Sequence, residues 1–325
     1  MKAAVYIQYG SPDVVEVKDV EKPVPTDEEV LIAIRAASVN AMDLGAVRGT
    51  PFLVRMMFGL RAPKDTRLGV DVAGVVEAVG RNVTQFKPGD AVFGNCRGAF
   101  AEYRCAAESA LVAMADGVTF EQAACVPVAG FTALQGLRKG GVGPGRKVLV
   151  HGAGGGVGTF AVQIAKAFGA EVTAVTSAAN ADTMRSIGAD HVIDYTRENF
   201  TRLAQRYDLI LDCYATHSPL ACRRALSPGG AYVMVGGPIV RSTDPLVTVI
   251  AASVLSWFGT RKLRLLFARR SKDDLATLIG LVRDGKLAPA IGRRFRLSEV
   301  RDAIRCLAEG KARGKVVITM DNNDD

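Results

Sequence analysis

The 325-residue chain has few aromatic side chains, few histidines and no closely spaced pair of cysteines. Aromatic residues make up 6% of the chain, with one tryptophan, Trp257, and three histidines. None of the six cysteines forms a Cys-x-x-Cys pair, so neither a zinc knuckle nor a redox dithiol is indicated. The excess of +8 charges is compatible with an anionic ligand such as a nucleotide phosphate. No aromatic-basic interleaving accompanies it, so we expect no nucleic-acid binding.

Long hydrophobic runs are also missing. The first ten residues lack the apolar core of a signal peptide. The longest apolar stretch, 246–258, is shorter than the ~20 residues that span a bilayer. We therefore expect a cytoplasmic protein whose cysteines are free thiols, since the cytoplasm keeps thiols reduced.

The composition that remains, 49% hydrophobic and 23% charged residues, is typical of a folded globular protein. The length indicates about two domains. The first third contains short apolar or alternating runs separated by Gly, Pro and Asp turns, which is typical of a β-sandwich or barrel. We expect its strands at 3–7, 14–17, 30–36, 72–79 and 91–93.

The pattern changes near residue 120, where a helix is expected over 120–136. Strands then alternate with helical segments, notably 157–168 and 181–187, which predicts a doubly wound parallel sheet. The expected strands are 147–151, 171–175, 191–194, 209–212 and 231–235. Helices at 272–283 and 299–309 and a strand at 315–320 end the chain. The sequence thus predicts an α/β protein in which residues 1–125 and 271–325 form one domain and 126–270 a nucleotide-binding domain.

A glycine-rich turn over 152–158 separates an apolar strand from an apolar helix, the context that a dinucleotide-binding turn requires. Ala153, Gly155 and Gly158 take the three positions of the Gly-x-Gly-x-x-Gly pattern, with alanine replacing the first glycine. Glycines let the backbone approach a pyrophosphate, and the following helix presents its N–H groups. The candidate contacts are Ala153, Gly155, Gly156, Val157 and Gly158; the alternative is a glycine-rich loop without a ligand.

Ser177 stands at the end of the second strand of this unit, where an acidic residue would bind the ribose 2′-hydroxyl of NAD. A neutral hydroxyl tolerates a 2′-phosphate, which a carboxylate would repel. No Lys or Arg follows immediately, so we expect NADPH as the cofactor and leave NADH open.

Taken in order, several short motifs resemble the medium-chain dehydrogenase/reductase superfamily, in its zinc-free quinone oxidoreductase branch. The motifs lie at 37–43, 69–76, 79–90, 98–103, 130–133, in the glycine-rich turn with Gln163 and Lys166, at 188–195 and at 314–318. They cover nearly the whole chain. The resemblance implies a GroES-like β-domain built from both chain ends, a central Rossmann domain, and a homodimer.

The chain departs from its zinc-dependent relatives at the three positions that match their catalytic zinc ligands. These positions hold Asn40, Val70 and Ala129, so we expect no zinc. Gly45 stands where some zinc-free relatives place a tyrosine. Without a metal, hydride transfer from a nicotinamide favours acceptors that are already activated. The resemblance therefore implies NAD(P)H-dependent reduction of a quinone or a conjugated carbonyl.

The resemblance also suggests catalytic residues. Asn40 and Thr132 are expected near nicotinamide and substrate, where Asn40 would orient a carbonyl oxygen; alternatively, Asn40 closes a turn. Asp43 and Asp71 would take part in a proton relay. Alternatively, these carboxylates hold a loop in place or pair with an arginine.

Further residues are expected near the cofactor. Tyr195 would contact the adenine side of the cofactor; alternatively, it packs in the core or at the surface. Lys315, with Arg313, would reach a phosphate, or it lies in a solvated turn. His151 and His191 are expected to be structural, whereas His217 lies in a loop that could approach the cofactor.

Two apolar segments have no assigned place. The loop 50–60 either caps a substrate pocket or packs as core. The apolar and basic segment 246–270 is expected to contact a second copy or line a pocket, with a membrane surface as an alternative. The alternative functions are an enoyl or alkenal reductase of the same fold, and a non-catalytic NADPH-binding protein that uses this segment for a partner or membrane.

Overall fold

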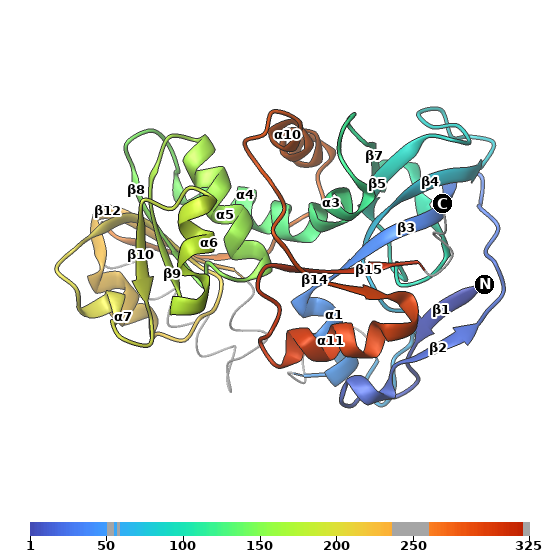
Figure 1. Ribbon diagram of the computed structural model, residues 1–325, viewed down its shortest axis with the longest axis horizontal. Helices are drawn as coiled ribbons and strands as arrows, with labels where there is room; N and C mark the ends of the chain where they lie inside the picture. The colour runs from blue at the N-terminus through green and yellow to red at the C-terminus, as the bar shows by residue number, and fades with distance from the viewer. Residues whose placement is uncertain (51–54, 57–58, 236–259, 321–325) are drawn as a thin grey trace. The chain divides into compact units, whose positions relative to one another are not determined.

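The computed structural model describes residues 1–50, 55–56, 59–235 and 260–320, in two compact units. Unit 1 comprises Met1–Ala129, Arg270–Gly285 and Pro289–Asp325, and unit 2 comprises Gly130–Arg269 and Lys286–Ala288. Both chain ends therefore belong to unit 1 (Figure 1).

Unit 1 is built around a seven-stranded sheet whose long strand β3 (Glu29–Val39) pairs antiparallel with three others. These are β4 (Asp71–Val79), β6 (Tyr103–Ala107) and β15 (Lys315–Thr319). The sheet continues through β5 (Ala91–Asn95) to β7 (Leu111–Ala113) on one side and through β15 to β14 (Ile291–Arg296) on the other. A separate ribbon joins β1 (Lys2–Val5) and β2 (Glu16–Asp19).

Two helices of unit 1 begin after a residue whose side chain accepts a backbone N–H group of the first turn. Thr119 caps α3 (Phe120–Cys125), Ser271 caps α10 (Lys272–Arg283), and Asn40 precedes α1 (Ala41–Arg48). Helix α11 (Val300–Ala308) buries Val300, Ala303 and Ile304 in the same apolar core as the strands.

Unit 2 contains a six-stranded sheet in the order β10-β9-β8-β11-β12-β13, with every pair parallel. Numbered along the chain from β8, this is the 3-2-1-4-5-6 order of dinucleotide-binding folds. The strands are β8 (Lys147–His151), β9 (Glu171–Thr176), β10 (His191–Asp194), β11 (Tyr207–Asp212), β12 (Leu226–Val235) and β13 (Lys262–Leu266). Helices α5 (Gly156–Ala167), α6 (Ala181–Ser186) and α7 (Pro219–Arg224) lie between them in sequence. The predicted α/β fold class is thus confirmed.

The helix expected over 120–136 is wrong in one respect, because two helices occupy it. α3 ends at Cys125, and α4 (Pro127–Gly140) starts at a proline, which has no N–H to continue the first helix. Strands β6, β7, β13 and β14 were not expected from the sequence. Residues 51–54, 57–58 and 236–259, with Trp257, lie outside the described residues, so much of the two apolar segments does too. Within the described ranges, no helix is long and apolar enough to cross a membrane.

Candidate active site

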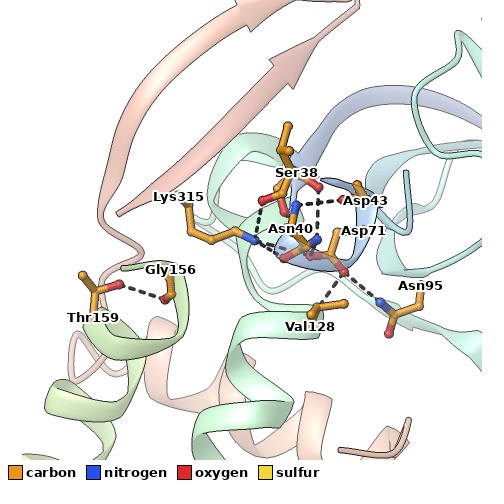
Figure 2. Close-up of polar contacts among 10 residues, drawn as sticks. Ser38, Asn40, Asp43, Asp71, Asn95, Val128, Gly156, Thr159 and Lys315 are labelled. Atoms are coloured by element: carbon orange, nitrogen blue, oxygen red, sulfur yellow. Dashed lines mark hydrogen bonds and ion pairs between the residues drawn. The ribbon is translucent and has the colours of Figure 1, made fainter. Parts of the chain in front are cut away.

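The sheet register of unit 1 brings Asn40, Asp71 and Lys315 together at the ends of neighbouring strands. Ser38 lies opposite Asp71 in the β3–β4 pair, and Val39 lies opposite Val316 in the β15–β3 pair. Asn40, which follows β3, is therefore close to the first residues of β4 and β15, namely Asp71 and Lys315 (Figure 2).

Asp71 is completely buried and accepts hydrogen bonds on both carboxylate oxygens. Its Oδ2 accepts from Ser38 Oγ at 3.0 Å and from Asn40 Nδ2 at 2.9 Å. Its Oδ1 accepts from Asn95 Nδ2 at 2.8 Å and from the N–H of Val128 at 3.1 Å (Figure 2). Burial raises the pKa of Asp71, and the Lys315 ammonium together with these donors opposes that rise.

The side chain of Asn40 lies between Lys315 and Asp71. Lys315 Nζ donates to Asn40 Oδ1 at 2.7 Å, and Asn40 Nδ2 donates to Asp71 and, at 3.2 Å, to the carbonyl of Ser38. Both N–H groups and the oxygen of this amide therefore have protein partners. Lys315 is 2% exposed, and its Nζ lies 3.6 Å from Asp71 Oδ2.

Asp43 joins this cluster through the first turn of α1. Its Oδ2 accepts the backbone N–H of Asn40 at 2.7 Å, the reciprocal half of a capping box. Burial, with the charge of Asp71 adding to it, raises the pKa of Asp43 to about 7. The structure thus brings Asn40, Asp43 and Lys315 together, and the carboxylate of Asp71 pairs with a lysine rather than an arginine. Arg313 is exposed in the turn before β15.

The three positions that match zinc ligands do not provide a zinc-binding donor set. Val70 and Ala129 have no ligating atom, and the oxygen of Asn40 is bound to a positively charged ammonium. The nearby thiol of Cys125 is buried, and burial raises its pKa to about 12. Among the residues that the structure describes, no group of three or more His, Cys, Asp or Glu could hold a metal ion.

In unit 2, the glycine-rich turn joins β8 to α5. Gly152 has φ +80°, a conformation that favours glycine, and Gly155 is exposed at the N-cap of α5. A Cβ on Gly158 would lie 2.2 Å from the carbonyl oxygen of Gly152, so this glycine allows the helix to pack against the turn. Thr159 Oγ1 donates to the Gly156 carbonyl at 3.0 Å within the first turn (Figure 2). The first N–H groups of α5 have no acceptor within the helix and fit a phosphate.

The end of β9 lies beside this turn. Ala153 donates its N–H to the carbonyl of Val175, and Tyr195 donates its N–H to that of Thr176. Ser177, which follows β9, is half-buried, and Tyr195 is 60% exposed. The structure therefore groups the predicted cofactor residues Ala153, Ser177 and Tyr195 at one edge of the sheet. Thr132 is half-buried on α4.

One buried polar pair at this edge was not predicted as a pair. His151 ends β8 and Asp212 ends β11, and His151 Nδ1 lies 2.8 Å from Asp212 Oδ1. Asp212 also accepts from Tyr232 Oη at 2.8 Å. His217 packs near His151, with ring centroids 5.3 Å apart, and burial lowers its pKa. The expected structural role of His151 fits this pairing, and His191 pairs with Glu171 at the surface.

Comparison with known proteins decides the family. Family profiles match an alcohol dehydrogenase GroES-like domain over 26–129, an alanine dehydrogenase/PNT C-terminal domain over 122–216 and a zinc-binding dehydrogenase over 187–318. A 2-methylene-furan-3-one reductase of Solanum lycopersicum is 33% identical over 98% of this chain and 79% of its own length. The chain belongs to the medium-chain dehydrogenase/reductase superfamily.

Solved structures place this superfamily member in the quinone oxidoreductase-like branch, as the sequence predicted. The quinone oxidoreductase of Coxiella burnetii has a TM-score of 0.88 and 29% identity, over 98% of this chain and 99% of that one. A mycobacterial protein solved with NADPH has a TM-score of 0.83 and 27% identity, over 98% of this chain and 100% of that one.

Proposed function

We propose that this oxidoreductase reduces a quinone or a conjugated carbonyl compound with NADPH and without a zinc ion. The observation that carries the proposal is the replacement of a zinc-ligand position by an asparagine whose oxygen is bound to the ammonium of Lys315. The similarity to a 2-methylene-furan-3-one reductase and to a quinone oxidoreductase supports these two acceptor classes.

The cofactor would be held by the glycine-rich turn and the end of β9. The pyrophosphate would lie on the N–H groups of Gly156, Val157 and Gly158, approached through the exposed backbone of Gly155. Bound NADPH supplies the hydride that the acceptor takes up. Helix α5 supplies the positive end of its dipole, which favours a pyrophosphate at this edge of the sheet.

We assign the preference for NADPH over NADH to Ser177. Its hydroxyl adds no negative charge at the end of β9, so a 2′-phosphate is tolerated there. The mycobacterial relative that was solved with NADPH supports this choice. Tyr195 would contribute its exposed ring on the adenine side.

The acceptor would be handled by Asn40, Asp43 and Thr132. Both N–H groups of Asn40 are committed, so a carbonyl acceptor would have to replace the longer contact, at 3.2 Å to the Ser38 carbonyl. Asp43, with a pKa of about 7, can hold or release a proton near neutral pH. Thr132, which belongs to the motif 130–133, would contribute its hydroxyl from α4.

Domain roles and assembly are part of the proposal. Residues 1–125 and 271–325 would be the catalytic domain and 126–270 the nucleotide-binding domain. We propose a homodimer, since β13 ends the described six-stranded sheet and offers its outer edge to a second copy. The free thiols of all six cysteines support a cytoplasmic location.

The experiment that tests the function follows NADPH absorbance with chelator-treated protein and a panel of quinones, enones, enals and simple aldehydes. We expect turnover with quinones or conjugated carbonyls and none with simple aldehydes. NADPH binding without any turnover would instead favour a non-catalytic binding protein. Turnover that needs added zinc would contradict the zinc-free proposal.

A further inference from the structure

Lys315 is a buried cation at the first residue of β15. Burying an ammonium is costly unless charged or polar groups compensate it. Its shortest contact is Asn40 Oδ1 at 2.7 Å, whereas Asp71 Oδ2 at 3.6 Å and the Val39 carbonyl at 3.5 Å lie farther away (Figure 2). The Lys315 ammonium therefore forms its short hydrogen bond with the amide of Asn40 and not with the carboxylate of Asp71.

The amide of Asn40 can take only one orientation between these two charges. In the observed orientation its oxygen accepts from Lys315 and its NH₂ group donates to Asp71 and to the Ser38 carbonyl. A flip of the amide would place NH₂ against the ammonium and the oxygen against the carboxylate, losing every one of these hydrogen bonds. Lys315 therefore binds the oxygen of the Asn40 amide, and Asp71 binds its NH₂ group.

We propose that Lys315 is a positioning residue, whose ammonium fixes the Asn40 amide for the reduction step and does not bind the cofactor phosphate. The effect of Lys315 on the reaction rate rests on the proposed function. The structural part of the proposal, the fixed amide, is independent of any activity. The sequence instead predicts that Lys315 reaches a phosphate, and the two roles differ in which constant a substitution changes.

The first test replaces the ammonium while keeping a long apolar side chain, in Lys315→Met. Misplacing a reacting group by about 1 Å can cost about 100-fold in rate. We expect kcat to fall by about tenfold or more, the dissociation constant for NADPH to stay within about twofold, and the primary isotope effect with 4-deuterated NADPH to increase. A rise in that constant with kcat unchanged would make Lys315 a phosphate contact and overturn the proposal, as would no change in either constant.

A double variant separates positioning from charge balance. Lys315→Met alone leaves Asp71 without its counter-ion, so Lys315→Met combined with Asp71→Asn removes both charges and is compared with Asp71→Asn alone. We expect the double variant to have a lower kcat than Asp71→Asn alone, because the Asn40 amide then lacks the partners of both of its ends. An equal kcat in these two variants would show that Lys315 only neutralises Asp71 and would overturn the proposal. Lys147→Met is the matched control, because Lys147 also begins a strand but is exposed; it should leave kcat unchanged.

A nuclear magnetic resonance measurement tests the fixed amide even if no acceptor is turned over. Selective ¹⁵N labelling of the seven asparagines gives few side-chain amide signals, and Asn40→Ala identifies that of Asn40. We expect two sharp Asn40 proton signals in the wild type, and in Lys315→Met two signals that are broadened and shifted toward those of an unconstrained asparagine amide. Identical signals in both proteins would overturn the proposal. Absence of turnover in the wild type would instead contradict the proposed function alone.

Discussion

His151 Nδ1 lies 2.8 Å from Asp212 Oδ1, and the two residues end adjacent parallel strands, β8 and β11. In the 3-2-1-4-5-6 order, these strands flank the point where the direction of winding reverses and dinucleotides bind. The carboxylate also accepts the backbone N–H groups of Tyr214 and Ala215, so it holds the start of the loop after β11. A buried pair therefore fixes the two backbone segments that border the proposed cofactor site.

Replacing Asp212 should destabilise the protein strongly. In Asp212→Ala, the His151 ring and the backbone N–H groups of Tyr214 and Ala215 lose the carboxylate oxygen with which they form hydrogen bonds. Breaking a buried pair in this way costs about 3 kcal/mol or more of unfolding free energy, measured by urea denaturation. Glu171→Gln breaks the exposed pair of Glu171 with His191 and should cost less than about 1 kcal/mol. Equal effects of the two substitutions would contradict the structural role of the buried pair.

Asp43 should make the stability depend on pH between about 4 and 7. Its pKa is about 7 in the folded protein and near 3.8 when unfolded, so the folded state binds more protons in this window. The free energy of unfolding should therefore fall as pH rises through the window, by up to about 4 kcal/mol. Asp43→Asn keeps an oxygen acceptor for the Asn40 N–H and should remove this decline.

The measurement for Asp43 is urea denaturation at several pH values between 4.5 and 7.5, with the exposed Asp116→Asn as control. The difference between wild type and Asp43→Asn should change with pH, whereas that between wild type and Asp116→Asn should not. Parallel curves for all three proteins would contradict the assignment.

The glycine-rich turn predicts that Gly155 matters for binding and Gly158 for folding. A Cβ on Gly155 meets only the Gly152 carbonyl oxygen, at 3.5 Å, so Gly155→Ala should fold normally. Its methyl group would occupy the exposed side of the turn and weaken NADPH binding by about tenfold or more, measured by fluorescence titration. Gly158→Ala should lower the unfolding free energy by about 1–3 kcal/mol, because its Cβ has no room. Gly143→Ala, with open space around it, should change neither quantity.

Ser177→Asp should exchange the cofactor preference. A carboxylate at the end of β9 repels a 2′-phosphate and can accept a hydrogen bond from a 2′-hydroxyl. We expect the ratio of kcat/KM for NADPH to that for NADH to fall by about tenfold or more. Ser186→Asp adds the same charge at an exposed position at the end of α6 and should leave the ratio near that of the wild type. Equal ratios in all three proteins would remove Ser177 as the determinant.

Local sequence patterns were sufficient for much of unit 2. The β-branched run before Gly152 and the apolar helix after Gly158 specify a strand, a turn and a helix from neighbouring residues alone. The same patterns predicted β9, β10 and β11, and with them the grouping of the glycine-rich turn and Ser177. The edge strand β13 alternates basic and apolar residues over 262–265, but it lies inside the segment 246–270, which was interpreted as a single apolar and basic unit, so it was missed.

The polar cluster of unit 1 could not be predicted because it depends on strand register. Lys315 and Asn40 are 275 positions apart, and they meet because β15 pairs with β3. Read as a sequence, Lys315 looked like a solvated or phosphate-binding lysine. Likewise, the Asp212 partner of His151 depends on the pairing of β8 with β11. Residue types in the sequence suggested which side chains belong to the site, whereas the partner of each side chain could be seen only in the tertiary fold.

The most direct test of zinc-free hydride transfer follows the hydride itself. Chelator-treated protein is incubated with a conjugated enone and NADPH deuterated at C4, in separate reactions for the two faces, and the product is analysed by nuclear magnetic resonance. We expect deuterium at the β-carbon of the reduced enone from one of the two labelled cofactors, at a rate that added zinc does not increase. Product without deuterium from either cofactor, or product formed only after zinc is added, would contradict zinc-free hydride transfer.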